Sequence, residues 1–103
     1  MICIMQGDAY SIDIGLVDDE GNALTPEMVD EVEVSLGTLK KSYPDTVVYD
    51  EGEYLFPLTQ TETLAMPIGL KTFQVRVKFN GGDVVGCNLP NVMVMMAKSK
   101  EVL

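Results

Sequence analysis

The chain has 103 residues, of which 47% are hydrophobic and 22% are charged, a composition typical of one globular domain. Its net charge of −9 argues against nucleic-acid binding through a basic face and against contact with an acidic membrane. The absence of histidine excludes Ser-His-Asp and Cys-His catalysis, and no Gly-rich phosphate loop is present. We therefore expect no enzyme activity, no cofactor, no metal and no small-molecule substrate.

The N-terminal segment predicts a strand that bends near its middle. Ile2–Gln6 and Ala9–Val17 are predicted as one strand, interrupted at Gly7 and Asp8 by a bulge or corner. Asp18–Asn22 is predicted as a polar turn, with weak calcium binding as the alternative, although its spacing does not fit an EF-hand. Because the apolar start is too short for a signal peptide, we expect synthesis in a cytoplasm.

The middle of the chain predicts short strands separated by turns. Thr25 and Pro26 indicate a helical turn, since threonine is a common N-cap and proline suits the first helical position. We then expect a strand, a loop and a two-stranded hairpin, in this order: Val32–Leu36, Lys40–Asp45, and Thr46–Tyr49 with Glu53–Leu58.

Thr59 and Glu62 match a capping box, in which each side chain bonds to the other residue's backbone amide. This pattern predicts one or two helical turns that end near Ala65. We expect Leu64 to lie against the core and Pro67 to stop the helix.

The strongest strand pattern is Thr72–Phe79, followed by the turn sequence Asn80–Asp83 and a second strand that starts at Val84. The polar residues Gln74, Arg76 and Lys78 occupy its outward face. The inward face consists of Phe73, Val75, Val77 and Phe79.

The last predicted strand, Val92–Met96, is apolar on both faces, whereas a strand with one wet face alternates. Val92, Val94 and Met96 lie on one face. Met93 and Met95 lie on the opposite face, which is either covered by a loop or the tail or else contacts a partner.

The two cysteines, Cys3 and Cys87, are predicted to be small buried apolar residues. A disulfide between them is the alternative, which a reducing compartment disfavours.

Charge is unevenly distributed along the chain. Residues 1–62 carry a net charge of −12, and residues 63–103 carry +3. The simplest interpretation is a solubilising surface. The alternative is a dipolar protomer whose acidic side meets the basic side of a neighbour, which would build rings or tubes.

Strand signals at short intervals predict an all-β sandwich or barrel. Of these two, we expect an antiparallel β-sandwich of about seven strands with one or two short helical turns. We expect a single domain over residues 1–96 and a C-terminal tail over residues 97–103.

Five segments of the chain form a recognisable succession of strands and turns: Gly7–Ile14, Asp18–Asn22, Val32–Leu36, Tyr54–Thr63 and Gln74–Phe79. Their order resembles small immunoglobulin-like β-sandwich proteins of bacteriophages and prophages of Gram-positive bacteria, including the N-terminal domain of baseplate upper proteins. This resemblance implies an immunoglobulin-like fold and a non-enzymatic structural or accessory protein of the tail or baseplate type, synthesised in the bacterial host cytoplasm and, if it is assembled into particles, found in the virion. Its partners would be other phage structural proteins or further copies of itself.

No functional residue is transferred from this resemblance, because the family pattern is structural. The candidate interface consists of Gln74, Arg76, Lys78, Met93 and Met95. The alternative function is an acidic DNA mimic that inhibits a host nucleic-acid-binding protein, motivated by the −12 charge of residues 1–62.

Overall fold

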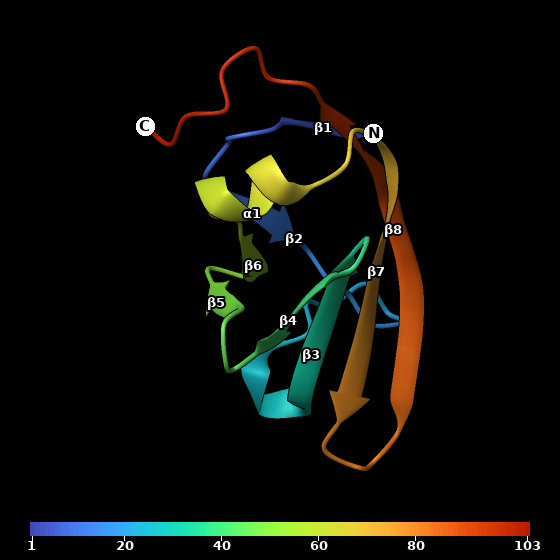
Figure 1. Cartoon of the computed structure of the whole chain (residues 1–103). Coiled ribbons are helices and arrows are strands. Elements are labelled where there is room, and N and C mark those ends of the chain that lie inside the picture. The colour runs from blue at the N-terminus through green and yellow to red at the C-terminus, as the bar shows by residue number, and fades with distance from the viewer.

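The computed structural model describes residues 1–103 and shows an all-β chain of eight strands in two sheets, with two short helices (Figure 1). The strand order is β1-β8-β7-β3-β4 in the five-stranded sheet and β2-β6-β5 in the three-stranded sheet. The elements are β1 (Ile2–Met5), β2 (Ser11–Ile14), η1 (Pro26–Met28), β3 (Val29–Leu36), β4 (Leu39–Tyr43), β5 (Val48–Asp50), β6 (Glu53–Pro57), α1 (Gln60–Ala65), β7 (Gly69–Phe79) and β8 (Val84–Met95).

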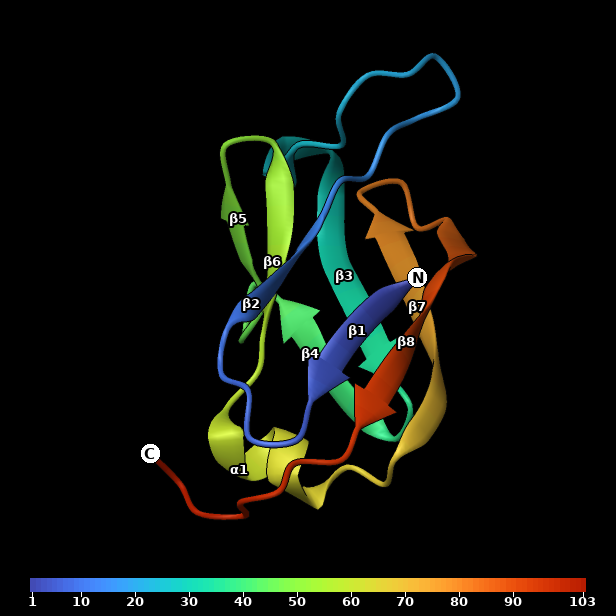
Figure 2. The same ribbon diagram turned by 90° about the horizontal axis from the view of Figure 1, so that it is seen from above.

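The core lies between the two sheets, which Figure 2 separates into β2, β5 and β6 on one side and β7 and β8 on the other. The rings of Phe56 on β6 and Phe73 on β7 meet edge to face across the sheets, 5.9 Å apart. Tyr54 is fully buried and donates a 2.9 Å hydrogen bond to the carbonyl of Leu24. Burial, with Tyr43 nearby, raises the pKa of Tyr54 to about 12, so this donor stays protonated at neutral pH.

The first predicted strand is two strands, because the chain changes sheets at Gly7 and Asp8. Gly7 has a φ of 95°, which a residue with a Cβ rarely adopts. β1 pairs in parallel with β8, whereas β2 pairs antiparallel with β6. The corner is confirmed, and the single continuous strand is wrong.

The predicted loop over Lys40–Asp45 is also wrong, since residues up to Tyr43 form β4 against β3. The hydrophobicity pattern does not reveal this strand, because Lys41 points inward but carries a charge. Its side chain is 10% exposed, and its Nζ donates to Glu62 at 2.8 Å and to the carbonyl of Pro57 at 2.6 Å. The charge is tolerated there because it is paired and hydrogen-bonded.

Both helical segments are confirmed, with differences in detail. The reciprocal bonds of the capping box between Thr59 and Glu62 are present. Thr63, not Leu64, is the fully buried residue of α1. Thr25 occupies the N-cap position of η1 but makes no side-chain capping bond.

β7 and β8 form the long hairpin in the centre of the five-stranded sheet, and the inward face of β7 is buried as predicted. The two predicted strands that follow the turn are one continuous strand, β8. It ends at Met95, one residue before the predicted end of the strand, and Met96 is 64% exposed. Ala97 is buried instead.

The predicted burial of the cysteines is wrong: Cys3 and Cys87 are both exposed and form no disulfide. Cys3 alternates along β1 with the inward-facing Ile2 and Ile4, so it lies on the outer face of the sheet. Cys87 pairs with the buried Val75 and shares its inward direction, but the three-stranded sheet does not cover this part of β8.

The segment after β8, residues 96–103, contains no helix or strand and runs toward α1 (Figure 2). The amide of Leu103 donates to Oε1 of Gln60 at 2.6 Å, and the Lys100 ammonium bonds to Oε1 of Gln6. These contacts place the tail beside the corner that joins the two sheets.

We predict that Thr63→Val destabilises the fold by about 1 to 3 kcal/mol. The Thr63 hydroxyl accepts from the amide of Gly7 at 2.9 Å and donates to the carbonyl of Asp8 at 2.8 Å, and valine keeps the shape while leaving both groups unpaired. Urea unfolding measures the effect. The matched control Thr61→Val, on the exposed side of α1, should stay within about 0.5 kcal/mol of wild type; equal losses in the two variants would contradict the assignment.

The carboxylate of Glu62 makes the stability of the fold depend on pH. Partial burial raises the pKa of this group, but the hydrogen bonds from Lys41 and Thr59 outweigh that effect and lower the pKa below its usual value. A carboxyl with a lowered folded-state pKa stabilises the fold above the unfolded-state pKa of about 4.3, and this contribution disappears as the pH falls through the folded-state pKa.

Glu62→Gln should therefore lower the free energy of unfolding by about 1.5 kcal/mol at pH 7, since glutamine can still cap but carries no charge. The difference between variant and wild type should shrink as the pH falls below about 4. Urea unfolding at pH 7 and again below about pH 4 measures this difference in the free energy of unfolding. A difference that stays constant with pH would show that the ion pair with Lys41 contributes nothing.

Candidate interaction surface

All five residues predicted as an interface lie on one surface, the outer face of the five-stranded sheet. They divide into two zones along the β7–β8 hairpin. Gln74, Arg76 and Lys78 pair with the N-terminal half of β8, from Asn88 back to Val84. Met93 and Met95 lie on its C-terminal half, beside β1.

The zone around Arg76 is electrically balanced. Arg76 donates from Nε and Nη2 to Oε1 of Glu33, at 3.0 and 2.7 Å, and Lys40 approaches the same carboxylate at 3.9 Å. Lys78 pairs in register with Glu31 on β3. A cationic hairpin face, as the sequence suggested, is therefore not what a partner would meet, because β3 sets acidic side chains directly beside the basic ones.

Gln74 is likewise engaged, since its Nε2 donates to Oδ1 of Asn88 across the hairpin at 2.8 Å. The polar zone is thus a network of cross-strand pairs. Such exposed pairs contribute little to stability, typically less than about 1 kcal/mol each, since solvent screens them.

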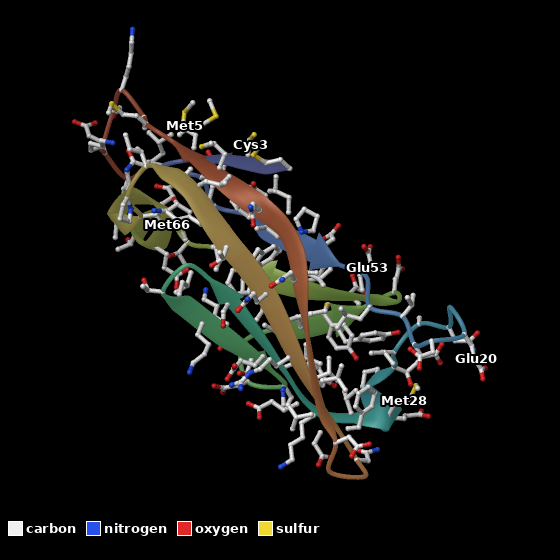
Figure 3. The ribbon with its side chains drawn as sticks, turned by 90° about the vertical axis from the view of Figure 1, so that its right-hand side faces the viewer. Cys3, Met5, Glu20, Met28, Glu53 and Met66 are labelled. Atoms are coloured by element: carbon white, nitrogen blue, oxygen red, sulfur yellow. The ribbon has the colours of Figure 1, made fainter.

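The other zone is an apolar patch, which we call the methionine patch and define as Cys3, Met5, Leu70, Met93 and Met95. Register places them together: Cys3 pairs with Met93, Met5 with Met95, and Leu70 with Met93. Figure 3 shows Cys3 and Met5 at the β1 end of the sheet, where sulfur atoms gather. Leu70 is 53% exposed, Met95 45% and Met5 44%, so the patch faces solvent.

Sequence reasoning missed three members of this patch. Cys3 and Met5 carried a usable signal, because a strand that buries Ile2 and Ile4 must turn the odd-numbered residues outward. Leu70 carried no such signal, because it lies before Thr72–Phe79, the segment in which apolar and polar residues alternate clearly. Neither the tail nor a loop covers Met95, while Met93 is half-buried among its cross-strand neighbours.

A cavity of about 410 Å³ opens between α1 and the β3–β4 turn. Its polar lining includes Glu62 and Lys71, with Leu36, Leu39 and Met66 as apolar walls. Because Glu62 already accepts bonds from Thr59 and Lys41, its carboxylate is engaged in holding the helix and β4.

The acidic turn at Asp18 is held by its own side chain, and the predicted turn is confirmed. Oδ1 of Asp18 accepts from the amides of Glu20 and Asn22, both at 2.9 Å. No three His, Cys, Asp or Glu side chains come close enough to one another to hold a metal ion. Neither helix is long and apolar enough to cross a membrane.

Comparison with protein-family models, with curated protein sequences and with solved structures finds no match to this chain.

Proposed function

We propose that the chain is a non-enzymatic structural or accessory protein of a bacteriophage or prophage, of the tail or baseplate type. It would be an immunoglobulin-like sandwich that acts by protein–protein contact through the outer face of its five-stranded sheet. The partner would be another structural protein of the same particle. The phage assignment comes from the sequence resemblance, and the contact surface comes from the exposed side chains.

The strand order supports an immunoglobulin-like topology. In such domains the strands C, F and G form one sheet and B, E and D belong to the other. The neighbours β3, β7 and β8 match C, F and G, while β2, β6 and β5 match B, E and D. The chain lacks tryptophan and the inter-sheet disulfide, so antibody-type domains are a poor comparison.

The observation that carries the contact proposal is the methionine patch. Solvent-exposed apolar clusters on a sheet face mark interaction sites more often than isolated apolar residues do. Methionine suits such a surface because it is flexible and polarisable, so it adapts to a partner's shape. The patch is contiguous across β1, β8 and β7, which makes it a single docking area rather than scattered exposure.

The polar zone would then serve as the rim of this contact. Arg76 is already paired with Glu33 within the sheet, so a partner that approaches there need not strip an unpaired guanidinium of water. A balanced rim beside an apolar centre is the usual arrangement of a protein–protein interface.

The DNA-mimic alternative has less support. A mimic needs carboxylates on one continuous face, whereas the acidic groups here occupy separate turns, such as Asp18–Glu20 and Asp50–Glu53. Glu33, on the flat sheet face, is bound to Arg76 and Lys40.

The test replaces one exposed residue of the patch. Met95→Asp should leave the melting temperature within a few degrees of wild type, because Met95 is 45% exposed. By contrast, Val94→Asp should prevent folding, since Val94 is 1% exposed and a buried carboxylate is strongly unfavourable.

In the phage or prophage that carries the gene, the wild-type chain should co-purify with particles, as detected by immunoblot. Met95→Asp should reduce the bound amount by about tenfold or more, which corresponds to about 1.4 kcal/mol of binding free energy. Ser11→Asp, on the exposed face of β2, is the matched control and should bind normally. Absence of the wild-type chain from particles would contradict the virion role, and normal binding of Met95→Asp would contradict the patch.

A further inference from the structure

The N-terminal half of β8 is an open sheet edge. β1 pairs only with residues Val92 to Met95, so Val84–Asn91 has β7 on one side and no strand on the other. In Figure 1 this half of β8 forms the right-hand border of the molecule, and Figure 3 looks onto it. An open edge presents unpaired backbone groups to any strand that can approach it.

The directions of these backbone groups follow from the hairpin. The amide of Phe79 donates to the carbonyl of Asp83 at 2.8 Å, so Asp83 faces β7. Because successive residues of a strand point to opposite sides, Gly86 and Asn88 direct their N–H and C=O groups to the open edge, as does Val84. The next edge-facing residue is Pro90, which has no N–H, so the usable edge runs from Val84 to Asn88.

This edge lacks the charges that usually protect one. From Val84 to Ala97 the chain has fourteen residues without an Asp, Glu, Lys or Arg, its longest uncharged run. Val84 and Val85 are 58% and 56% exposed. Beneath the strand lies a groove of about 300 Å³. Its lining is mainly apolar and includes Leu16, Leu24, Val85 and Cys87, and the acidic turn contributes Asp18 and Asp19 to it.

We propose that two copies of this chain associate by antiparallel pairing of β8 with β8 over Val84–Asn88, which joins two five-stranded sheets into one of ten strands. Such a pairing is two-fold symmetric and closed, with Gly86 or Cys87 at the axis. In either register, each residue whose N–H and C=O groups face the open edge lies opposite a residue of the same kind on the other copy. These groups can therefore hydrogen-bond across the interface.

The edge itself fits a second copy, because antiparallel pairing of two identical strands satisfies the free N–H and C=O groups of both molecules at once. Two molecules that each carry −9 repel one another, and the uncharged strand is where they can approach with the least repulsion. It follows that added salt strengthens this dimer, because salt screens the repulsion. If the acidic side of one copy bound the basic side of another, added salt would instead weaken the association, because salt screens the attraction.

The inference does not depend on the phage assignment, and its surface differs from the methionine patch. The two cysteines mark the two surfaces, with Cys87 on the open edge and Cys3 in the patch. Both cysteine side chains are exposed, so the same substitution can be made at each position to give a matched pair of variants.

Sedimentation equilibrium up to about 1 mM protein tests the dimer, since a short edge is a small interface that dissociates on dilution. The wild type and Cys3→Lys should dimerise, and more tightly in high salt. Cys87→Lys should weaken association at least tenfold, because it places two like charges beside the axis. A monomer at the highest concentration, or equal association of the two variants, would overturn the proposal.

Thiol cross-linking gives an answer even if Cys87→Lys does not fold. Pairing sets the two Cys87 residues opposite or diagonal to each other, with their Cα atoms about 4.5 to 8 Å apart. A short bismaleimide should therefore link the Cys3→Ser variant, whose remaining thiol is Cys87, into dimers. Cys87→Ser should stay uncross-linked. Dimers formed only through Cys3 would overturn the β8 pairing and indicate self-association through the methionine patch instead.

Discussion

The buried hydroxyl of Thr63 holds the corner on which the arrangement of both sheets depends. It accepts from the amide of Gly7 and donates to the carbonyl of Asp8, at the point where the chain leaves one sheet for the other. Asp8 in turn closes back on the strand, since its carboxylate accepts from the amide of Met5 and its amide donates to the carbonyl of Met5. The capping box orients α1 so that Thr63 points at this corner.

The placement of β1 along β8 decides which surfaces stay open. β1 runs parallel to β8, from Ile2 opposite Val92 to Met5 opposite Met95, so the N-terminal half of β8 has no partner strand on that side. The corner covers the end of β1, because Asp8 occupies both edge-facing backbone groups of Met5. The end of β1 is thus capped by Asp8, while the adjoining edge of β8 is neither capped nor charged. The methionine patch forms where β1 joins β8, on the outer face of the same sheet.

Local patterns predicted the parts of the fold that depend on neighbouring residues. The alternation of Thr72–Phe79 identified β7, and Thr59 with Glu62 identified the start of α1, since both signals lie within a few residues. β4 was missed because Lys41 is inward-facing and is accepted there through Glu62, a partner that is distant in sequence.

The candidate interface was also only partly predictable from the sequence, because some of its contacts join residues that are distant in sequence. The alternation rule placed Gln74, Arg76, Lys78, Met93 and Met95 on outward faces, as the structure has them. It could not reveal that Glu33 neutralises Arg76, because that pairing depends on strand order. Nor could it show that Cys87, on the inward face, lies beyond the reach of a second sheet of only three strands.

The central claim is that the edge of β8 is open in the monomer and is filled by a second copy. Amide hydrogen exchange, resolved by residue across a range of protein concentrations, tests it most directly. Val85 and Cys87 face β7 and should be protected at every concentration. Gly86 and Asn88 should exchange rapidly in dilute solution and become protected as the concentration rises. Rapid exchange of Gly86 and Asn88 at all concentrations would contradict the pairing, and their protection in dilute solution would contradict the open edge.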